Sequence, residues 1–148
     1  MKKVLALVLT LAMALCVFVG CGGSKLTDGT YRAEDAEADK RGWTEFAEIV
    51  VENGKIVSAN FDSINGEGVL KSQDESYKQS MLGKGGITHP GEFYDALEEQ
   101  YMQKQDSTKM DTIAGATTSS DNITLLLAEI EAQIKAGKPG TYKVAKVG

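Results

Sequence analysis

The 148-residue sequence has little cysteine and histidine: its two cysteines are Cys16 and Cys21, and its single histidine is His89. Zinc, haem and iron–sulfur sites need several such side chains, so the sequence lacks a ligand set for them. His89 precedes Pro90, a pairing typical of a helix start, and we expect a structural role for it. No Ser-His-Asp or Cys-His combination indicates hydrolysis. We therefore expect neither a metal site nor an enzymatic centre.

Basic residues are in the minority and form no cluster. Sixteen Lys and Arg stand against 21 Asp and Glu, which gives a formal net charge of −5. Nucleic-acid binding needs a basic patch that contacts phosphates, so this balance argues against it. The acidic pairs Glu34-Asp35 and Asp74-Glu75 lack the alternating spacing of a calcium loop. We interpret these pairs as solvated acidic surface.

A long apolar run occurs at the N-terminus, where Met1-Lys2-Lys3 precedes Val4 to Val19. This basic-then-apolar order, too short for a membrane span, predicts a lipoprotein signal peptide over residues 1–20. The following Phe18-Val19-Gly20-Cys21 is similar to a lipobox, in which the Cys is lipidated and becomes the first mature residue. An ordinary secretory signal or an N-terminal anchor helix are the alternatives. Lipidation of Cys21 predicts membrane attachment through the lipid on the extracytoplasmic side.

Removal of the signal peptide leaves Cys21 as the only cysteine, and 14 Lys and Arg against 21 Asp and Glu. A lone acylated cysteine cannot form an internal disulfide, so a buried core has to stabilise the mature protein. We expect a tether over residues 21–27, one folded domain over 28–137 and a C-terminal tail over 138–148. About 110 residues suffice for one such core.

The clearest local signal is a β-hairpin. Two β-prone runs, 46–51 and 55–61, flank Glu52-Asn53-Gly54, and Asn-Gly between such runs favours a tight turn. Alternation along the strands predicts that one face of the hairpin consists of Ala47, Ile49, Val51, Val57, Ala59 and Phe61. We expect a first strand over residues 30–33 and a short strand over 109–113.

Three stretches predict helices. Residues 74–82 form a short one, and another starts at Thr88-His89-Pro90 with an apolar stripe of Phe93, Leu97 and Tyr101. The strongest helical periodicity comes last, with Ser119 or Ser120 as the expected cap and an apolar face of Ile123, Leu126, Leu127, Ile130 and Ile134. Together these elements predict an α+β fold, a small antiparallel sheet with helices packed on one side.

The run from Asp111 to Ser120, DTIAGATTSS, carries the strongest functional signal. It places Gly115 and Ala116 beside the Thr117 hydroxyl, just before the last helix. Small residues let the backbone approach a ligand closely, and a helix N-terminus offers free N–H donors to a phosphate. One interpretation is a phosphate-holding turn with a nucleophilic Thr. The other is a strand-to-helix connection in which the hydroxyl residues are helix caps.

Asp-x-x-x-Gly-Ala-Thr followed by Thr and Ser resembles the signature of the FMN-binding domain family. That family includes small subunits of membrane ion-pumping redox complexes and lipoproteins of extracellular electron transfer. The chain from Asp28 to about Ile134 also resembles small single-domain lipoproteins of that family. Besides the Thr117 region, the matching features are Asp28-Gly29-Thr30-Tyr31, Gly42-Trp43, Asn53-Gly54-Lys55-Ile56-Val57 and Lys71-Ser72.

The resemblance implies that Thr117 accepts FMN through its phosphate, from a flavin transferase that uses FAD as donor. Gly115 and Ala116 would form the turn, and Asp111 would be the upstream acidic position. Thr118 and Ser119 complete the expected cofactor-binding set. One departure is Ala114, which stands where the pattern usually has Ser or Thr. Candidates for contact with the flavin ring, each of which is also a candidate core residue, are Trp43, Tyr77, Phe93, Tyr94 and Tyr101.

These expectations describe a membrane-anchored FMN protein that carries electrons between redox partner proteins, rather than an enzyme with a substrate of its own. Lys71-Ser72 follows a Gly-containing loop and could face the cofactor or lie in solvent. The alternative is a non-redox surface-binding or antigen-like lipoprotein that keeps the fold without covalent flavin. Ala114 is the feature that favours this alternative.

Overall fold

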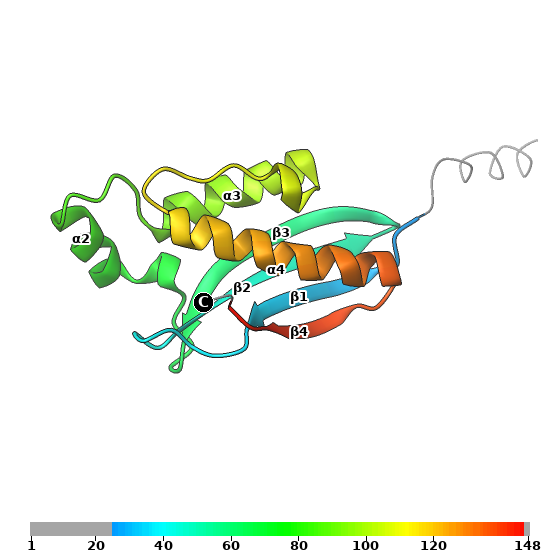
Figure 1. The fold of residues 1–148 in the computed structure, drawn as a ribbon, viewed down its shortest axis with the longest axis horizontal. Helices are drawn as coiled ribbons and strands as arrows, with labels where there is room; N and C mark the ends of the chain where they lie inside the picture. Colours follow the sequence, from blue (N-terminus) through cyan, green and yellow to red (C-terminus); the bar gives the residue numbers. More distant parts are fainter. Residues whose placement is uncertain (1–24, 147–148) are drawn as a thin grey trace, which may run out of the picture.

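The sheet forms the base of the domain in the computed structural model, which describes residues 25–146 (Figure 1). Its order is β3-β2-β1-β4, and the neighbouring pairs β1–β2 and β2–β3 are antiparallel, whereas β4 lies parallel to β1. The strands are β1 (Gly29–Asp35), β2 (Trp43–Glu52), β3 (Lys55–Asn65) and β4 (Gly140–Val144). The expected first strand and hairpin strands are all present and extend beyond the ranges that the sequence indicated.

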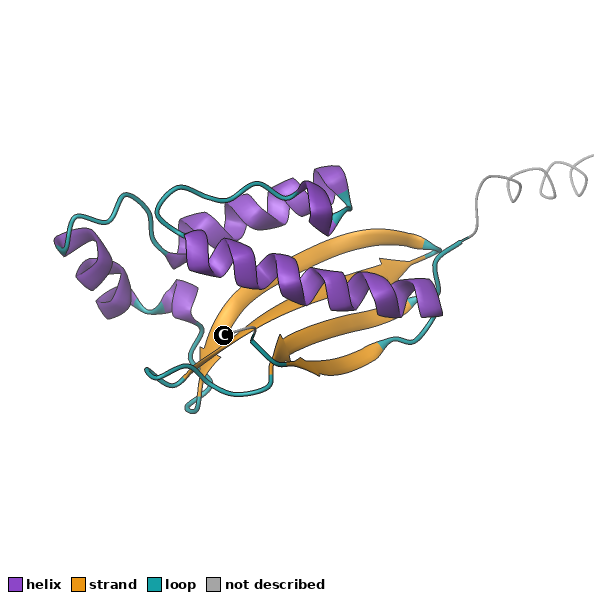
Figure 2. Cartoon of the chain, viewed as in Figure 1, coloured by secondary structure: helices purple, strands orange, loops and turns teal. Residues whose placement is uncertain are grey.

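The longer helices, α3 (Pro90–Lys104) and α4 (Thr117–Ala136), lie together against one face of the sheet (Figure 2). The 3-10 turn η2 (Lys71–Gln73) and the shorter α2 (Glu75–Gly83) connect β3 to α3, and a second 3-10 turn, η3 (Ser107–Lys109), lies between α3 and α4. This arrangement confirms the predicted α+β fold class. Among the helices between residues 25 and 146, none combines the length and apolar character needed to cross a bilayer.

The β2–β3 hairpin closes at Asn53-Gly54 as predicted. Both residues have positive φ, 53° and 75°, which is the backbone of a type I′ turn and matches the twist of the strands. The Asp28 carboxylate accepts hydrogen bonds from the N–H groups of Asn53 at 3.0 Å and Gly54 at 2.8 Å. The turn is therefore fixed by backbone preference and by a side chain that precedes β1.

One part of the predicted hairpin face is wrong. Ala47 pairs with Phe61 and Ile49 with Ala59, but an irregularity between Val50 and Val51 shifts the register, and Val51 pairs with Ile56. A bulge adds a residue on one strand and reverses the side-chain alternation beyond it. Val57 is consequently 46% exposed, and Ile56 packs against the core in its place.

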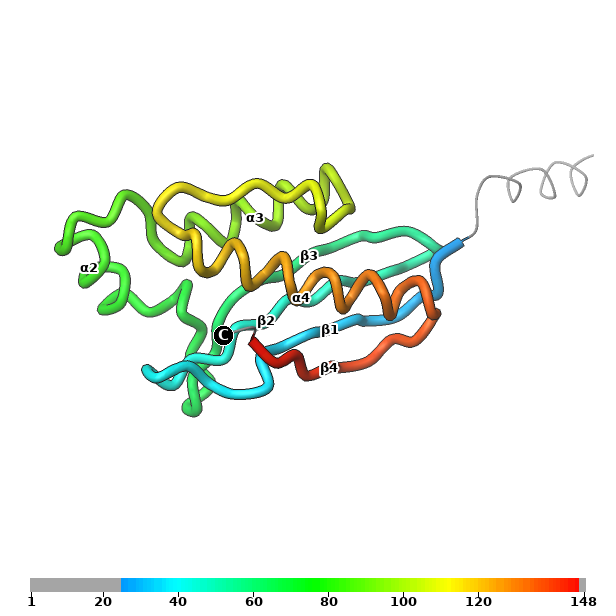
Figure 3. The backbone as a smooth tube through the Cα atoms, viewed as in Figure 1, coloured from blue at the N-terminus to red at the C-terminus, as the bar shows by residue number. Residues whose placement is uncertain are grey.

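The segment after α4, expected as a polar tail, continues into the sheet. Gly137, with φ of 66°, ends α4, and β4 then pairs with β1 from Tyr31–Gly140 to Asp35–Val144. Figure 3 shows the two strands side by side although more than a hundred residues separate them. An edge strand needs only backbone partners on one side, so its polar sequence gave no strand signal.

The strand expected over residues 109–113 does not form. Lys109 ends η3, and the following residues belong to none of the strands described here. Their backbone bonds a side chain instead: Asp111 N–H donates to Gln100 Oε1 at 2.8 Å, and Gln100 Nε2 donates to the Asp111 carbonyl at 3.2 Å. Helix α3 thus holds this connection alongside itself, outside the sheet.

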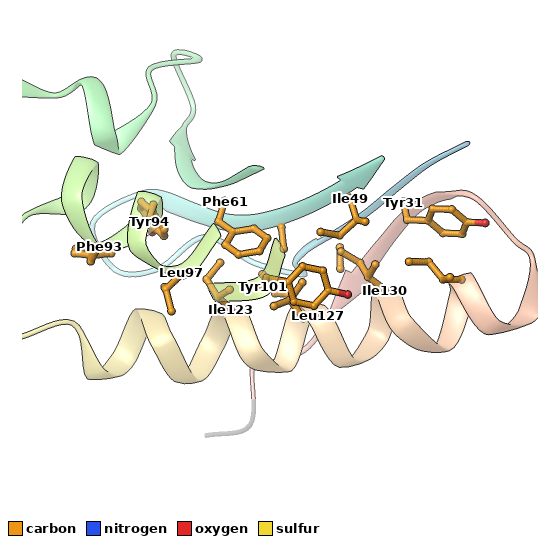
Figure 4. Close-up of a cluster of buried hydrophobic side chains, with 14 of the residues drawn as sticks. Tyr31, Ile49, Phe61, Phe93, Tyr94, Leu97, Tyr101, Ile123, Leu127 and Ile130 are labelled. Atoms are coloured by element: carbon orange, nitrogen blue, oxygen red, sulfur yellow. The ribbon is translucent and has the colours of Figure 1, made fainter. Parts of the chain in front are cut away.

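The core lies between the sheet and the two long helices (Figure 4). Phe61 on β3 packs against α3, where the Phe61 and Tyr101 rings lie edge to face with centroids 6.2 Å apart, and Ile49 on β2 belongs to the same buried cluster. The predicted apolar face of the last helix is buried throughout, with Ile123, Leu126, Leu127 and Ile130 fully inaccessible and Ile134 8% exposed. This core determines where each end of α4 lies.

Cys21, the signal peptide over residues 1–20 and most of the expected tether lie outside the described residues. The end of the tether is part of the domain. Leu26 packs against the core and its N–H donates to the Gly54 carbonyl at 3.3 Å, while the Tyr31 hydroxyl donates to the Thr27 carbonyl at 2.8 Å. The chain therefore enters the fold beside the hairpin turn.

Replacing Leu127 with Ala should destabilise the domain by about 2–5 kcal/mol, because it leaves a cavity between α4 and the sheet. The matched control is Leu125→Ala on the same helix, where the side chain is only partly buried. Urea unfolding followed by circular dichroism measures both changes. Equal losses in the two variants would contradict the packing described for α4.

Candidate functional site

Helix α4 begins at Thr117 without a side-chain cap. Its N-cap residue is Ala116, and the expected caps, Ser119 and Ser120, lie within the first helical turn. The Ser120 hydroxyl donates to the Ala116 carbonyl at 2.8 Å and accepts a hydrogen bond from Ile113 N–H at 3.0 Å. It ties the preceding loop to the helix but does not cap it, so the capping prediction is wrong.

The first helical N–H groups are consequently available. Ala116 N–H donates to the Ile113 carbonyl and Ser120 N–H to the Ala116 carbonyl. Between them, the N–H groups of Thr117, Thr118 and Ser119 have no hydrogen-bond partner within residues 25–146. Thr117 and Thr118 are exposed, so these donors lie at the positive end of the helix dipole and within reach of a ligand.

Gly115 forms the turn before α4, as expected. Its φ of +82° lies in the left-handed region, and a Cβ at this position would lie 2.8 Å from Ile87 Cγ1 and 3.2 Å from Thr88 Cγ2. A residue with a side chain would be both strained and crowded here. The loop at Ile87 can therefore pack directly against the backbone that leads into the helix.

A hollow of about 380 Å³ lies at this helix start, and we call it the α4 hollow. It is lined by Lys71, Tyr77, Met81, Phe93, Gly115, Ala116, Thr117, Thr118 and Ser119. The structure thus brings together five of the six candidate cofactor-binding residues. Asp111, the sixth, is outside: its Oδ2 accepts from Lys104 Nζ at 2.6 Å on the exposed side of α3.

The aromatic candidates separate into two groups. Tyr77 and Phe93 line the α4 hollow, and Trp43 packs edge to face against Tyr77 with ring centroids 6.0 Å apart. Tyr94 and Tyr101 are core residues, each at most 1% exposed. The side of the α4 hollow formed by α2 and α3 is therefore aromatic and apolar, with Met81 as a third member.

Lys71 also lines the α4 hollow, although the sequence alone did not decide whether it faces a ligand or lies in solvent. It is 8% exposed, and its Nζ lies 5.1 Å from the Trp43 ring centroid and 5.0 Å from that of Tyr77. Contacts of this kind contribute about 0.5–2 kcal/mol. The solvated-loop interpretation is wrong for this residue. Tyr77 lies on the next element of the chain, but Trp43 comes from β2, so only the preceding Gly loop hinted at the position of Lys71.

Beneath the α4 hollow lies a buried acidic network that the sequence did not reveal. The Glu45 carboxylate accepts hydrogen bonds from the Tyr94 hydroxyl at 2.5 Å and from Asn122 Nδ2 at 2.7 Å. The same Asn122 nitrogen donates to Asp35 Oδ1 at 2.9 Å, and Lys146 Nζ pairs with Asp35 Oδ2 at 2.9 Å. Asp35 has a cationic partner, whereas Glu45 relies on neutral donors.

Burial raises the pKa of Glu45, and the neighbouring Asp35 charge acts in the same direction. Hydrogen bonds from Tyr94 and Asn122, together with the nearby Ser119 side chain, oppose this rise in pKa without cancelling it. Ser119 lines the α4 hollow and so connects it to the network. No residue pattern could have indicated this contact, because Glu45 and Ser119 are far apart in sequence.

A larger hollow, of about 610 Å³, lies at the opposite end of α4, between the entering chain at Lys25–Thr27 and the helix end at Ile134–Gly137. Its acidic residue, Glu131, is already engaged, because the carboxylate accepts hydrogen bonds from Ser107 N–H at 2.6 Å and Ser107 Oγ at 2.7 Å. The α4 hollow is smaller but carries free donors and an exposed hydroxyl, so we take it as the candidate site.

The fold and the α4 hollow define a small α+β domain whose candidate ligand site lies at an uncapped helix start. No family model matches the sequence. The 15 kDa lipoprotein of Treponema pallidum (strain Nichols) is 35% identical over 112 residues, which cover 75% of this chain and 79% of that protein. The chain belongs to the family of this lipoprotein. The relationship supports the prediction that the chain is a lipoprotein associated with a membrane.

Two solved structures share the fold. A crystal structure of a Clostridium perfringens protein superposes with a TM-score of 0.74 at 35% identity, over 82% of this chain and 99% of that one. A solution structure from Clostridium thermocellum gives a TM-score of 0.51 at 25% identity, over 80% and 98% of the two chains. In both pairs the similarity extends over nearly the whole of the compared protein.

The buried Glu45 should give the protein a specific pH dependence. The pKa of Glu45 is raised on folding, so the folded state binds the proton more tightly than the unfolded state does. The stability that this proton contributes is fully present below the unfolded pKa of about 4.3. It is lost as the pH rises from there through the pKa of the folded state. We expect the unfolding free energy of the wild type to fall relative to Glu45→Gln over this range. Chemical denaturation from pH 4 to pH 8 measures the difference. A constant difference across that range would contradict the raised pKa.

Proposed function

We propose that this protein is a membrane-anchored, extracytoplasmic flavoprotein that binds FMN in the α4 hollow and acts as an electron carrier. The cofactor is joined by a phosphoester to Thr117, and the lipid on Cys21 attaches the protein to the membrane. The observation that carries the proposal is the exposed Thr117 hydroxyl at the uncapped start of α4, within a hollow that has aromatic walls.

The donor set suits a phosphate. Thr117, Thr118 and Ser119 present free N–H groups at the positive helix end, and Gly115 keeps the approaching backbone free of a side chain. A helix that uses Ala as its N-cap lacks the usual internal partner for these donors. Within residues 25–146 these donors have no acceptor, so the phosphate of an external ligand can accept hydrogen bonds from them.

Thr117 requires an activated donor and a base, because a hydroxyl is a weak nucleophile. In the proposed attachment Thr117 Oγ attacks the FMN phosphorus of FAD, and a new P–O bond forms as the pyrophosphate bond breaks. AMP leaves, and the hydroxyl proton passes to a base of the flavin transferase, which supplies the metal-assisted chemistry. The protein itself contributes an exposed hydroxyl on a fixed turn.

FMN supplies the electron-transfer chemistry once it is bound, and the chain provides its surroundings. Tyr77, Phe93 and Met81 offer apolar and aromatic surface for a flat ring system. Ser119 offers a hydroxyl, backed by the buried Glu45 and Tyr94. These residues can orient a ring and exclude water from one of its sides.

The position of the α4 hollow suits a carrier. Helix α4 has 20 residues and is therefore about 30 Å long, with Thr117 at one end and the entering chain at Lys25–Thr27 near the other. Figure 3 shows the chain entering the domain at the end opposite α2. A lipid anchor a few residues before Lys25 would leave the α4 hollow facing away from its attachment point, accessible to redox partner proteins.

The alternative function is a non-redox surface-binding or antigen-like lipoprotein without covalent flavin. Ala114 favours it, because the usual Ser or Thr hydroxyl is missing next to the acceptor turn. Ala114 is exposed, and the close contacts of Gly115 are with Ile87 and Thr88. The departure therefore bears on recognition by the transferase more than on the shape of the α4 hollow.

Coexpression of the full chain with a flavin transferase should add the mass of one FMN phosphoester to the protein. Thr117→Ala should abolish the gain, and Thr118→Ala, which removes the neighbouring exposed hydroxyl, should keep it. Intact-mass spectrometry measures all three proteins. Yellow protein of unmodified mass would show that FMN is bound non-covalently and would contradict the proposed phosphoester to Thr117. Colourless, unmodified wild-type protein would favour the non-redox alternative.

A further inference from the structure

The α4 hollow collects positive charge without a compensating negative group in its lining. The Lys71 side chain contributes a full charge from η2, and the start of α4 contributes the partial charge of its free N–H groups. None of the lining residues is Asp or Glu. Two positive groups that share one hollow repel each other unless an anion lies with them.

Lys71 itself lacks a partner in the structure. It is 92% buried, and its ammonium makes no hydrogen bond or ion pair with any residue in the range 25–146. Its contacts are the faces of the Trp43 and Tyr77 rings. The Nζ atom itself stays accessible, because the side chain opens onto the α4 hollow. The ammonium therefore remains available to a ligand in the α4 hollow.

Asp39, an acid whose pKa responds to the Lys71 charge, does not fill this role. Burial raises the pKa of Asp39. Hydrogen bonds from backbone N–H groups and the charges of Lys71 and Lys146 outweigh this effect and hold the pKa below its usual range. The Asp39 Oδ1 accepts hydrogen bonds from Arg41 N–H at 2.8 Å and Trp43 N–H at 3.0 Å. Asp39 thus holds the loop before β2 and forms no ion pair with Lys71.

Lys71 is held in place before any ligand arrives. The Asp62 carboxylate on β3 accepts hydrogen bonds from Ser72 N–H at 3.1 Å and Ser72 Oγ at 2.5 Å. A bridge between Ile64 and Leu70 fixes the residue on the other side of Lys71. With both neighbours anchored and the ammonium held over two rings, binding of a ligand requires little further ordering of the Lys71 side chain.

We propose that Lys71 and the free N–H groups of Thr117, Thr118 and Ser119 form a preformed site for the phosphate group of a flavin nucleotide. The site recognises the phosphate whether or not the ester to Thr117 is made. The identity of the nucleotide rests on the proposed function; the anion site rests on the charges described here. A phosphate accepts hydrogen bonds from backbone N–H groups and from an ammonium together, whereas riboflavin offers no such group.

Binding is tested on the full chain in mild detergent with Thr117→Val, which prevents ester formation and keeps the backbone donor. Dissociation constants for FMN and riboflavin are measured by flavin fluorescence. We expect FMN to bind about tenfold or more tightly than riboflavin. Adding Lys71→Met should remove this preference and leave riboflavin affinity unchanged, and Lys71→Arg should keep it. Lys84→Met, an exposed lysine after α2, is the matched control and should change nothing.

A preference for FMN that survives Lys71→Met would overturn the anion site and leave the flavin proposal intact. So would equal binding of FMN and riboflavin by the Thr117→Val protein. If neither flavin binds, the flavin proposal fails and inorganic phosphate decides the anion site separately. Trp43, the single tryptophan and a direct contact of Lys71, reports phosphate binding by fluorescence. A phosphate response that depends on Lys71 supports the site, and its absence overturns it.

Discussion

The packing of α4 across the sheet is the interaction on which the rest of the molecule depends. Five large aliphatic side chains on one face of the helix are buried, each contributing roughly 1.5–3 kcal/mol relative to exposure. This contact places Thr117 beside η2 and α3 at one end, and brings Gly137 to the entering chain at the other. It also returns the chain to β1, where β4 can pair in parallel. One helix thus positions the α4 hollow, the entry of the chain into the domain and the edge strand β4.

This strong packing also explains how α4 tolerates an N-cap residue that cannot accept a hydrogen bond through its side chain. Replacing a good N-cap residue with Ala typically costs about 1 kcal/mol, and α4 carries Ala at this position. Ser120, one turn later, uses its hydroxyl to hold the preceding loop rather than the free donors. A helix anchored along its length by the core can leave its first N–H groups without a side-chain acceptor, and those groups are the backbone donors of the proposed anion site.

The sequence predicted what depends on local pattern and missed what depends on distant contacts. Asn53-Gly54 and the apolar face from Ile123 to Ile134 are local signals, and both were confirmed. Val57 was placed on the wrong face because a bulge has no sequence signature, and β4 was missed because an edge strand can be polar. At the site, the residues around Gly115 follow from the motif. The position of Lys71 between Trp43 and Tyr77, and the contact of Ser119 with Glu45, require the folded chain.

Charge is divided across the first turn of α4. On the core side, Glu45 and Asp35 share the Asn122 amide, and Glu45 has no cation of its own. On the outer side, Lys71 and the free N–H groups have no acidic partner between residues 25 and 146. Ser119 lies between the two regions. Separated charges of this kind create a field across the α4 hollow that acts on any bound group whose charge changes, as that of a redox cofactor does. The neutral amide, hydroxyl and ring contacts that keep the two sides apart are therefore as important to the site as the charges themselves.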